Sequence, residues 1–214
     1  MLKQIFFRFL CFLVCVSAYS ADFSIRNDRL YISGRLENRQ SDAILQVLDK
    51  TPGVKTIVFE ECLGGQVGAA FFMNRVIREK GLNTMIKGQS LSSCALAFLA
   101  GRKRLFHEGV QQNIIMLHMP SPKNGITDST DFRVDAKVID LIGESTNGKM
   151  TESVFSKIRI SRGSAAGVYF VFRKILFVTM YTTVYCDGTE GAVLAKCQEL
   201  ENSDLISMGI LTSE

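Results

Sequence analysis

Apolar and polar positions in the first half of the chain alternate between two periods. Residues 54–60 form a short apolar run with branched side chains, which is typical of a buried strand. Residues 67–80 instead place apolar side chains three and four positions apart, which predicts a helix with one buried face. Such alternation predicts βαβ units, and therefore a mostly parallel sheet flanked by helices. In chain order, the predicted elements are two short strands within residues 22–36, a helix at 41–48, a strand at 54–60, a helix at 67–80, a strand at 83–87 and a compact helix that begins at Ser92-Ser93 and ends near Gly101.

The second half continues this pattern less regularly. It contains a basic link at residues 102–104, a strand at 114–118, a polar loop reaching residue 128, helices at 134–142 and 151–158, and a short apolar element at 205–210. The apolar stretch 167–186 is long enough to suggest a membrane span, but Arg173 and Lys174 lie near its middle, where a charge is costly. Its β-branched and aromatic residues favour strands or a buried contact between subunits. We therefore expect an α/β fold in one domain, residues 21–214, and membrane contact is the less favoured alternative.

The composition narrows the possible partners. The chain has 214 residues, of which 47% are hydrophobic and 21% charged, with a formal net charge of +4. This is ordinary for a globular protein that buries a sizeable core. No basic run or aromatic-rich basic patch occurs, so a nucleic-acid partner is not expected.

The first twenty residues have the pattern of a secretory signal peptide. A basic start precedes an apolar run to about Val16, and small residues follow at Ala18 and Ser20. We expect cleavage after Ser20 and export of the mature chain, to the periplasm if the source is bacterial. An uncleaved anchor and a lipoprotein at Cys15 are the alternatives.

Export changes the interpretation of the cysteines that remain after cleavage. They are Cys62, Cys94, Cys186 and Cys197. An even number in an oxidising compartment favours disulfides over metal, although three pairings are possible. The chain has two histidines and no cysteine pair with metal-ligand spacing, so no metal or other cofactor is expected.

The segment from Lys87 to Gly101, KGQSLSSCALAFLAG, combines a strand end, small polar residues and an apolar helix. A serine at such a turn projects its hydroxyl above the sheet, beside N–H groups that have no partner within the helix. This arrangement suits a nucleophile with part of an oxyanion hole next to it. The alternative is a serine that only caps an ordinary core helix.

Two other features fall at equivalent places in the predicted sheet. Gly64-Gly65 follows one strand, Ser92 follows the next, and His118 closes the strand after that. The carboxyl ends of parallel strands meet at one edge of a sheet, where sites form. There a glycine N–H can face a substrate, a serine can attack a carbonyl and a histidine can take its proton.

Four segments resemble the Clp/crotonase fold, and within it the Clp-type serine proteases and their exported relatives. They are RLYISGRLENRQSDAILQVL, CLGGQVGAAFFMNRVI, GQSLSSCALAFLAG and NIIMLHMP, which are similar to the family's opening strand and helix, its glycine segment, its nucleophile segment and its histidine strand. The resemblance runs from about Arg29 to Pro120, with a weak echo in ISMGILTSE near the end of the chain.

The resemblance implies a role for each matching residue. Ser92 is similar to the nucleophile and His118 to the general base, and the backbone N–H groups of Gly65 and Ser93 would form the oxyanion hole. If Ser93 were the nucleophile instead, the second N–H donor would be that of Cys94. The resemblance also implies a peptide or protein substrate and a homo-oligomer, for which residues 168–184 are the candidate contact.

The chain departs from the family's pattern at the third catalytic residue. The family's aspartate would fall near Ser161-Arg162, where the chain has no acid. Possible substitutes are Asp131, Asp135 and Asp187. The sequence therefore predicts an exported serine hydrolase, in the simplest case a peptidase acting through Ser92, and the alternative is a catalytically silent module that binds peptides or partners.

The expected oxyanion hole also bears on the disulfides. Gly65 and Ser93 can point N–H groups at one oxyanion only if their loops are close, which would bring Cys62 and Cys94 within bonding reach. We therefore expect bridges Cys62–Cys94 and Cys186–Cys197. The alternative for Cys94 is a free, small buried residue of the helix.

Overall fold

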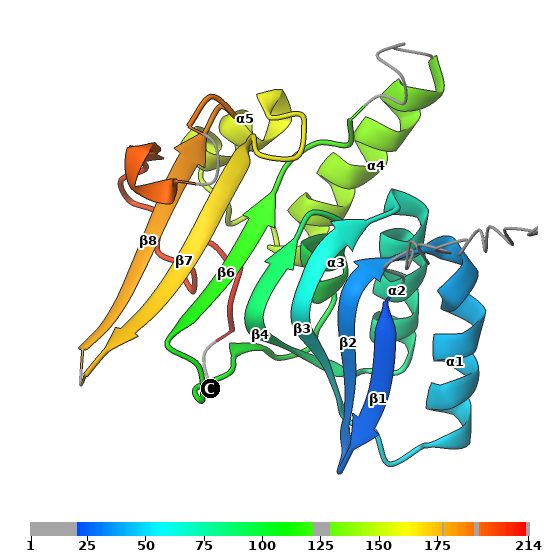
Figure 1. Ribbon diagram of the computed structural model, residues 1–214. Coiled ribbons are helices and arrows are strands. Elements are labelled where there is room, and N and C mark those ends of the chain that lie inside the picture. Colours follow the sequence, from blue (N-terminus) through cyan, green and yellow to red (C-terminus); the bar gives the residue numbers. More distant parts are fainter. Residues whose placement is uncertain (1–20, 122–128, 177, 191–192, 213–214) are drawn as a thin grey trace, which may run out of the picture.

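The computed structural model describes residues 21–121, 129–176, 178–190 and 193–212 (Figure 1). The predicted leader, residues 1–20, and most of the predicted polar loop, residues 122–128, lie outside these ranges. The strands are β1 (Asp22–Arg26), β2 (Arg29–Leu36), β3 (Thr56–Gly65), β4 (Asn83–Leu91), β5 (Arg104–Phe106), β6 (Gln112–Leu117), β7 (Gly167–Ile175), β8 (Val178–Cys186) and β9 (Gln198–Glu199). The helices are α1 (Ser41–Lys50), α2 (Val67–Glu79), α3 (Ser93–Phe98), α4 (Ser129–Ser145) and α5 (Glu152–Ile160), with short 3₁₀ turns η1 (Asn38–Gln40) and η3 (Leu194–Lys196).

The strands form one mixed sheet in the order β1-β2-β3-β4-β6-β7-β8-β9, and β5 pairs with β4. The pairs of β3 with β2 and β4, and of β4 with β5 and β6, are parallel. The pairs β1–β2, β6–β7, β7–β8 and β8–β9 are antiparallel. The expectation of a mostly parallel sheet is therefore wrong, although α/β is correct. Short turns join β1 to β2 and β7 to β8, and short turns can connect only antiparallel neighbours.

Helices α1, α2 and α3 cover one face of the sheet and close the core (Figure 1). Alternate side chains of β2 and β3, such as Leu30, Ile32 and Phe59, are fully buried in it. Helix α3 packs against β3 and β4, and all six of its residues are buried. Burying side chains of this size contributes about 1.5–3 kcal/mol each relative to exposure. This packing fixes the position at which α3 begins.

Two strands extend further than the sequence pattern predicts. Residues 61–65, expected to form a loop, continue β3 as far as Gly65, after a register shift between Glu60 and Cys62. Strand β4 continues to Leu91 rather than ending at Lys87. Glycine and serine carry little β-propensity, so only their pairing with neighbouring strands shows that the ladder continues. The extensions bring the glycine segment and the serine turn side by side.

The stretch 167–186 forms the antiparallel hairpin β7–β8, which confirms its prediction as strands. Within the described residues, no helix has the length and apolar character needed to cross a bilayer. Two minor predictions were wrong: the basic link includes the start of β5, and residues 205–210 form turns rather than a regular element.

Candidate functional site

A cavity of about 440 Å³ lies where β3, β4 and β6 end. It brings together all four residues expected to form the site, Gly65, Ser92, Ser93 and His118. They come from three different strand ends, which are adjacent because β3, β4 and β6 are neighbours in the sheet. The topology of the sheet thus gathers these residues into one cavity, as the strand-end argument predicted.

Ser92 occupies the turn between β4 and α3 in a conformation that is rare for a residue with a side chain. Its φ is 52° and its ψ is −117°. The turn is held from both sides, since the Ser92 N–H donates to the Met116 carbonyl at 2.8 Å and the Ser92 carbonyl accepts from the Leu96 N–H at 3.0 Å. A serine on a strained strand-to-helix turn is the geometry by which hydrolases expose a nucleophile.

The two neighbouring serines have different environments. The Ser93 hydroxyl donates to the Gly65 carbonyl at 3.1 Å, and the residue is buried. Ser92 is half-buried and lines the cavity, and its hydroxyl forms no hydrogen bond with any described residue. A side chain already engaged in a structural bond is a poorer nucleophile, so the geometry favours Ser92 over Ser93.

The glycine segment passes close to both β2 and the serine turn. Gly65 has a φ of +142°, and a Cβ atom there would lie 1.9 Å from the Leu36 carbonyl oxygen. Gly64 has a φ of +87°, and a Cβ atom there would lie 3.1 Å from the Ser92 Cβ. Glycine at position 65 is therefore a steric requirement.

A buried disulfide joins the glycine segment to α3. Cys62 and Cys94 are bonded with their Cα atoms 5.9 Å apart, and neither residue is exposed. The Gly64 N–H also donates to the Cys94 sulfur at 3.3 Å. The expected pairing is confirmed and the free-thiol alternative for Cys94 is wrong. The bridge ties the segment that carries Gly65 to the helix that begins at Ser93.

His118 lies just beyond the end of β6 with 9% of its surface exposed. Its buried Nδ1 atom has no hydrogen-bond partner among the described residues. Burial lowers the pKa of His118 below its ordinary 6.5, the Met119 backbone partly opposes this, and the positive charge of Arg162 lowers the pKa further. The imidazole is therefore neutral near pH 7, as a general base must be.

Arg162 occupies the place where the third catalytic residue was expected. Met119, the neighbour of His118, forms a bridge with Arg162, and its N–H donates to the Ser161 carbonyl at 3.0 Å. The position inferred for the family's aspartate is therefore close to His118, but it is occupied by the cation Arg162. Its guanidinium donates to the Pro120 carbonyl and to both oxygens of the Asp135 carboxylate.

The described alternatives for the missing acid form no hydrogen bond with His118. Asp135 is held by Arg162, and Asp187 accepts hydrogen bonds from the N–H and hydroxyl of Thr189. The Asp131 side chain lies outside the part that the structure describes. Neither Asp135 nor Asp187 completes a triad in this structure, because each carboxylate is bonded to another donor.

Sequence reasoning missed one wall of the cavity. Arg35, Asn38 and Gln66 line it beside the glycine segment, and the Asn38 N–H donates to the Gln66 side-chain oxygen at 2.8 Å. Arg35 is exposed, and its guanidinium has no partner among the described residues. No local motif marks Arg35, because the pairing of β2 with β3 brings the end of β2 to the glycine segment.

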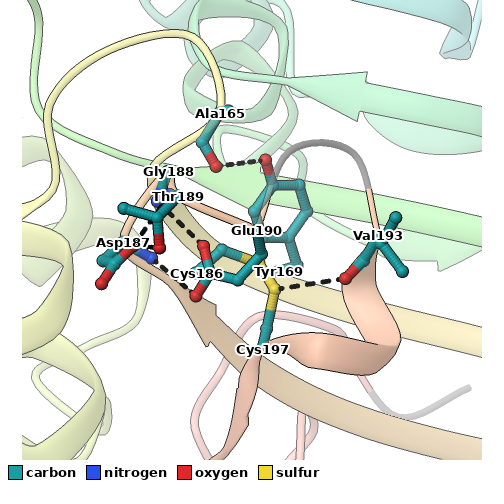
Figure 2. The surroundings of a disulfide bond; sticks show 9 residues. All are labelled: Ala165, Tyr169, Cys186, Asp187, Gly188, Thr189, Glu190, Val193 and Cys197. Carbon is teal, nitrogen blue, oxygen red and sulfur yellow. Dashed lines mark hydrogen bonds between the residues drawn. A yellow bond between two sulfur atoms is a disulfide. The ribbon is translucent and has the colours of Figure 1, made fainter.

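The second disulfide lies away from the cavity. Cys186 and Cys197 are bonded with their Cα atoms 4.8 Å apart, as expected, and Figure 2 shows Glu190 beside them. The three donor atoms lie within 4.8 Å of one another. The disulfide consumes both thiolates, and the Glu190 carboxylate accepts the N–H groups of Asp187 and Gly188 at 3.3 and 3.0 Å. In this oxidised form the cluster does not fit a metal ion.

Comparison with known proteins supports the fold and no finer assignment. No family model and no curated protein matches the sequence. Among solved structures, the chain is similar to a point mutant of ClpP1 from Listeria monocytogenes, with a TM-score of 0.51 and 19% sequence identity. The match covers 61% of this chain and 78% of that one. The protein therefore has a Clp-like fold.

Proposed function

We propose that the protein is an exported serine hydrolase, in the simplest case a peptidase, that forms an acyl-enzyme on Ser92 with His118 as general base. The observation that carries the proposal is the strained turn at Ser92, in one cavity with Gly65, Ser93 and His118. Strain of this kind costs on the order of 1–3 kcal/mol and persists where the surrounding structure imposes it. The backbone hydrogen bonds on both sides of Ser92 and the nearby disulfide supply that constraint.

The proposed reaction uses only groups in the cavity. The Ser92 oxygen attacks the substrate carbonyl carbon while His118 accepts the hydroxyl proton. The backbone N–H groups of Gly65 and Ser93 donate to the oxyanion of the tetrahedral intermediate. His118 then gives its proton to the leaving amine as the carbon–nitrogen bond breaks, and a water molecule hydrolyses the resulting ester by the same steps in reverse.

In the described part of the chain no acid bonds to His118 Nδ1, and this limits the expected rate. In a serine triad the acid orients the imidazole, and its loss costs about 10⁴ in kcat. Among the described residues no carboxylate or other side chain bonds to His118 Nδ1, so no acid orients the ring. We therefore expect a slow hydrolase.

The cavity walls suggest a substrate with both apolar and negative groups. Val67, Leu96 and Met116 supply apolar surface, and Arg35 supplies a positive charge. The described lining contains no carboxylate. A peptide with an apolar residue near an acidic one would satisfy both features.

A catalytically silent binding module is the second candidate, and a specific observation favours it. No hydrogen bond joins Ser92 to His118 in the described structure, and His118 Nδ1 has no partner. Apo geometry alone does not exclude catalysis, because such bonds often form only with substrate bound. Chemical labelling separates the two candidates.

The decisive experiment is labelling with a fluorophosphonate probe, which reacts rapidly only with an activated serine. Wild type and a Ser156→Ala control on α5 should label, whereas Ser92→Ala and His118→Ala should lose both labelling and hydrolysis while remaining folded. The double variant should be little worse than either single variant, because the two groups act as a unit. Equal labelling of wild type and Ser92→Ala would contradict the proposal, and loss in Ser93→Ala alone would move the nucleophile. A wild type that never labels would favour the binding module.

Export and oligomer formation remain predictions. Two disulfides fit an oxidising compartment. Mass spectrometry of the secreted chain should find Ala21 at its N-terminus, and light scattering should find more than one subunit per particle.

A further inference from the structure

The end of the β7–β8 hairpin carries a concentration of exposed apolar side chains. We define the hairpin tip as residues 173–176 and 178–181. Its large apolar side chains are 48% to 83% exposed, namely Ile175, Leu176, Val178, Met180 and Tyr181. Most large apolar side chains in β7 nearer the body are buried, including Val168, Phe170 and Phe172. Within the hairpin, exposure of large apolar side chains is therefore concentrated at the tip.

The tip is exposed on both of its faces. Neighbouring residues of a strand point to opposite faces, yet the last three residues of β7 and the first four of β8 are all exposed. The ladder between β6 and β7 ends at the pair Gln112 and Arg173, and one further bond runs from the Lys174 N–H to the Gln111 carbonyl at 2.8 Å. Beyond it only β7 and β8 pair with each other, so the tip is a two-stranded ribbon that projects from the body (Figure 1).

The charges at the tip are positive. Arg173 and Lys174 are both exposed, and the hairpin sequence from Gly167 to Cys186 contains no acidic residue. Glu108 of the adjoining body lines a cavity of about 390 Å³ together with Lys174 but forms no ion pair with it. Neither cation is thus neutralised by a described carboxylate.

We infer that the hairpin tip inserts into the surface of an anionic lipid bilayer, with Arg173 and Lys174 at the level of the phosphates. The register of the hairpin places Ile175, Val178 and Met180 on one face together with Arg173. This face and the turn at Leu176 therefore present exposed apolar side chains beside a cation, which is the combination that an anionic lipid surface binds. Leu176 lies three positions after Arg173, which corresponds to at most about 10 Å along an extended chain. This matches the depth of about 5–10 Å at which peripheral segments bury apolar side chains.

Binding through the tip would leave the serine cavity accessible. Strand β7 runs antiparallel to β6, so the tip lies beside the start of β6, whereas His118 and the cavity lie beyond its end. The two features therefore occupy opposite edges of the sheet. The inference is independent of the proposed hydrolase activity, because no residue of the tip lines the serine cavity.

The test is co-sedimentation with vesicles of phosphatidylcholine alone or mixed with phosphatidylglycerol. It uses the chain from Ala21 onward, which contains every described element, because the apolar residues 1–20 would bind lipid themselves. Wild type should bind the mixed vesicles and not the neutral ones. Leu176→Asp should weaken binding at least tenfold, and Arg173→Gln and Lys174→Gln about fivefold each. The matched control is Phe132→Asp on α4, because Phe132 is 78% exposed and Leu176 83%.

Three outcomes would overturn the inference. They are no binding of wild type to mixed vesicles, binding that Leu176→Asp leaves unchanged, and an equal loss in Phe132→Asp. If wild type is oligomeric without binding vesicles and Leu176→Asp is monomeric, the tip instead contacts a second copy of the chain. Circular dichroism and thermal unfolding of each variant establish that it remains folded, and Leu176→Ser provides a milder second substitution.

Discussion

The two edges of the same sheet are built in opposite ways. At the cavity, Ser92 is held by backbone hydrogen bonds, Gly65 fits directly against β2, and a buried disulfide joins the glycine segment to α3. At the hairpin tip, the side chains are exposed on both faces and only two strands pair. Backbone hydrogen bonds and a disulfide thus hold the cavity residues in position, whereas the side chains of the hairpin tip are exposed to solvent. Substitutions at the cavity should therefore change the free energy of unfolding more than substitutions at the hairpin tip.

The largest effect is expected from Gly65→Ala. The new Cβ would lie 1.9 Å from the Leu36 carbonyl oxygen, at a φ of +142°. Since neither backbone can move without breaking the sheet, the free energy of unfolding should fall by about 4 kcal/mol or more. Gly53→Ala is the matched control, because nothing lies within 4 Å of a Cβ there. Urea unfolding of both variants provides the measurement, and equal stabilities would contradict the steric argument.

Removing each disulfide in turn tests whether the Cys62–Cys94 bridge supports the cavity specifically or only stabilises the fold. The bridges close loops with sequence separations of 32 and 11 residues. Loop-closure entropy then predicts losses of about 3.7 kcal/mol for the alanine pair at Cys62 and Cys94 and about 2.8 kcal/mol for the pair at Cys186 and Cys197. Only the first pair should also reduce hydrolysis, because it alone touches the glycine segment. A similar loss of activity in both double variants would show that the effect is general.

The pH dependence tests the buried base of the cavity. Because burial and Arg162 hold the pKa of His118 below 6.5 in the folded protein, the unfolded chain binds more protons between that lower pKa and about 6.5. The contribution of His118 to stability is therefore present above about pH 6.5 and is lost as the pH falls through this window. The pH profile of kcat/KM should report the ionisation of the same imidazole, with its acid limb centred below pH 6.5. Subtracting the unfolding profile of His118→Gln isolates the residue, and an acid limb above 6.5 would contradict the assignment.

The smallest effect on stability is expected at the hairpin tip. Leu176→Asp replaces a side chain that is 83% exposed, so the free energy of unfolding should change by less than about 0.5 kcal/mol. Hydrolysis of a soluble peptide should also be unchanged, because the tip lies at the opposite edge from the cavity. Thermal unfolding and a peptide assay provide the measurements. A clear loss in either would mean that the tip supports the fold.

The elements whose pattern is local could be located from the sequence alone. Apolar spacing located the helices at α1 and α2 and the strand β3, because burial of one face leaves a period in the sequence. The order of the glycine pair, Ser92 and His118 at successive strand ends also predicted that they would share one edge of the sheet. That prediction needed only the rule that parallel strands end together.

Features that depend on contacts between distant residues became visible only in the folded molecule. The extension of β3 to Gly65, the antiparallel edges of the sheet and the wall that includes Arg35 follow from strand pairing, which leaves no local signal. The difference between Ser92 and Ser93 likewise depends on one hydrogen bond to the Gly65 carbonyl, 28 residues away in sequence. The environment of His118 is set in the same way, because packing from separate segments buries it and places Arg162 nearby. Periodicity reports only whether a residue is buried, and the identity of its neighbours is fixed when the sheet assembles.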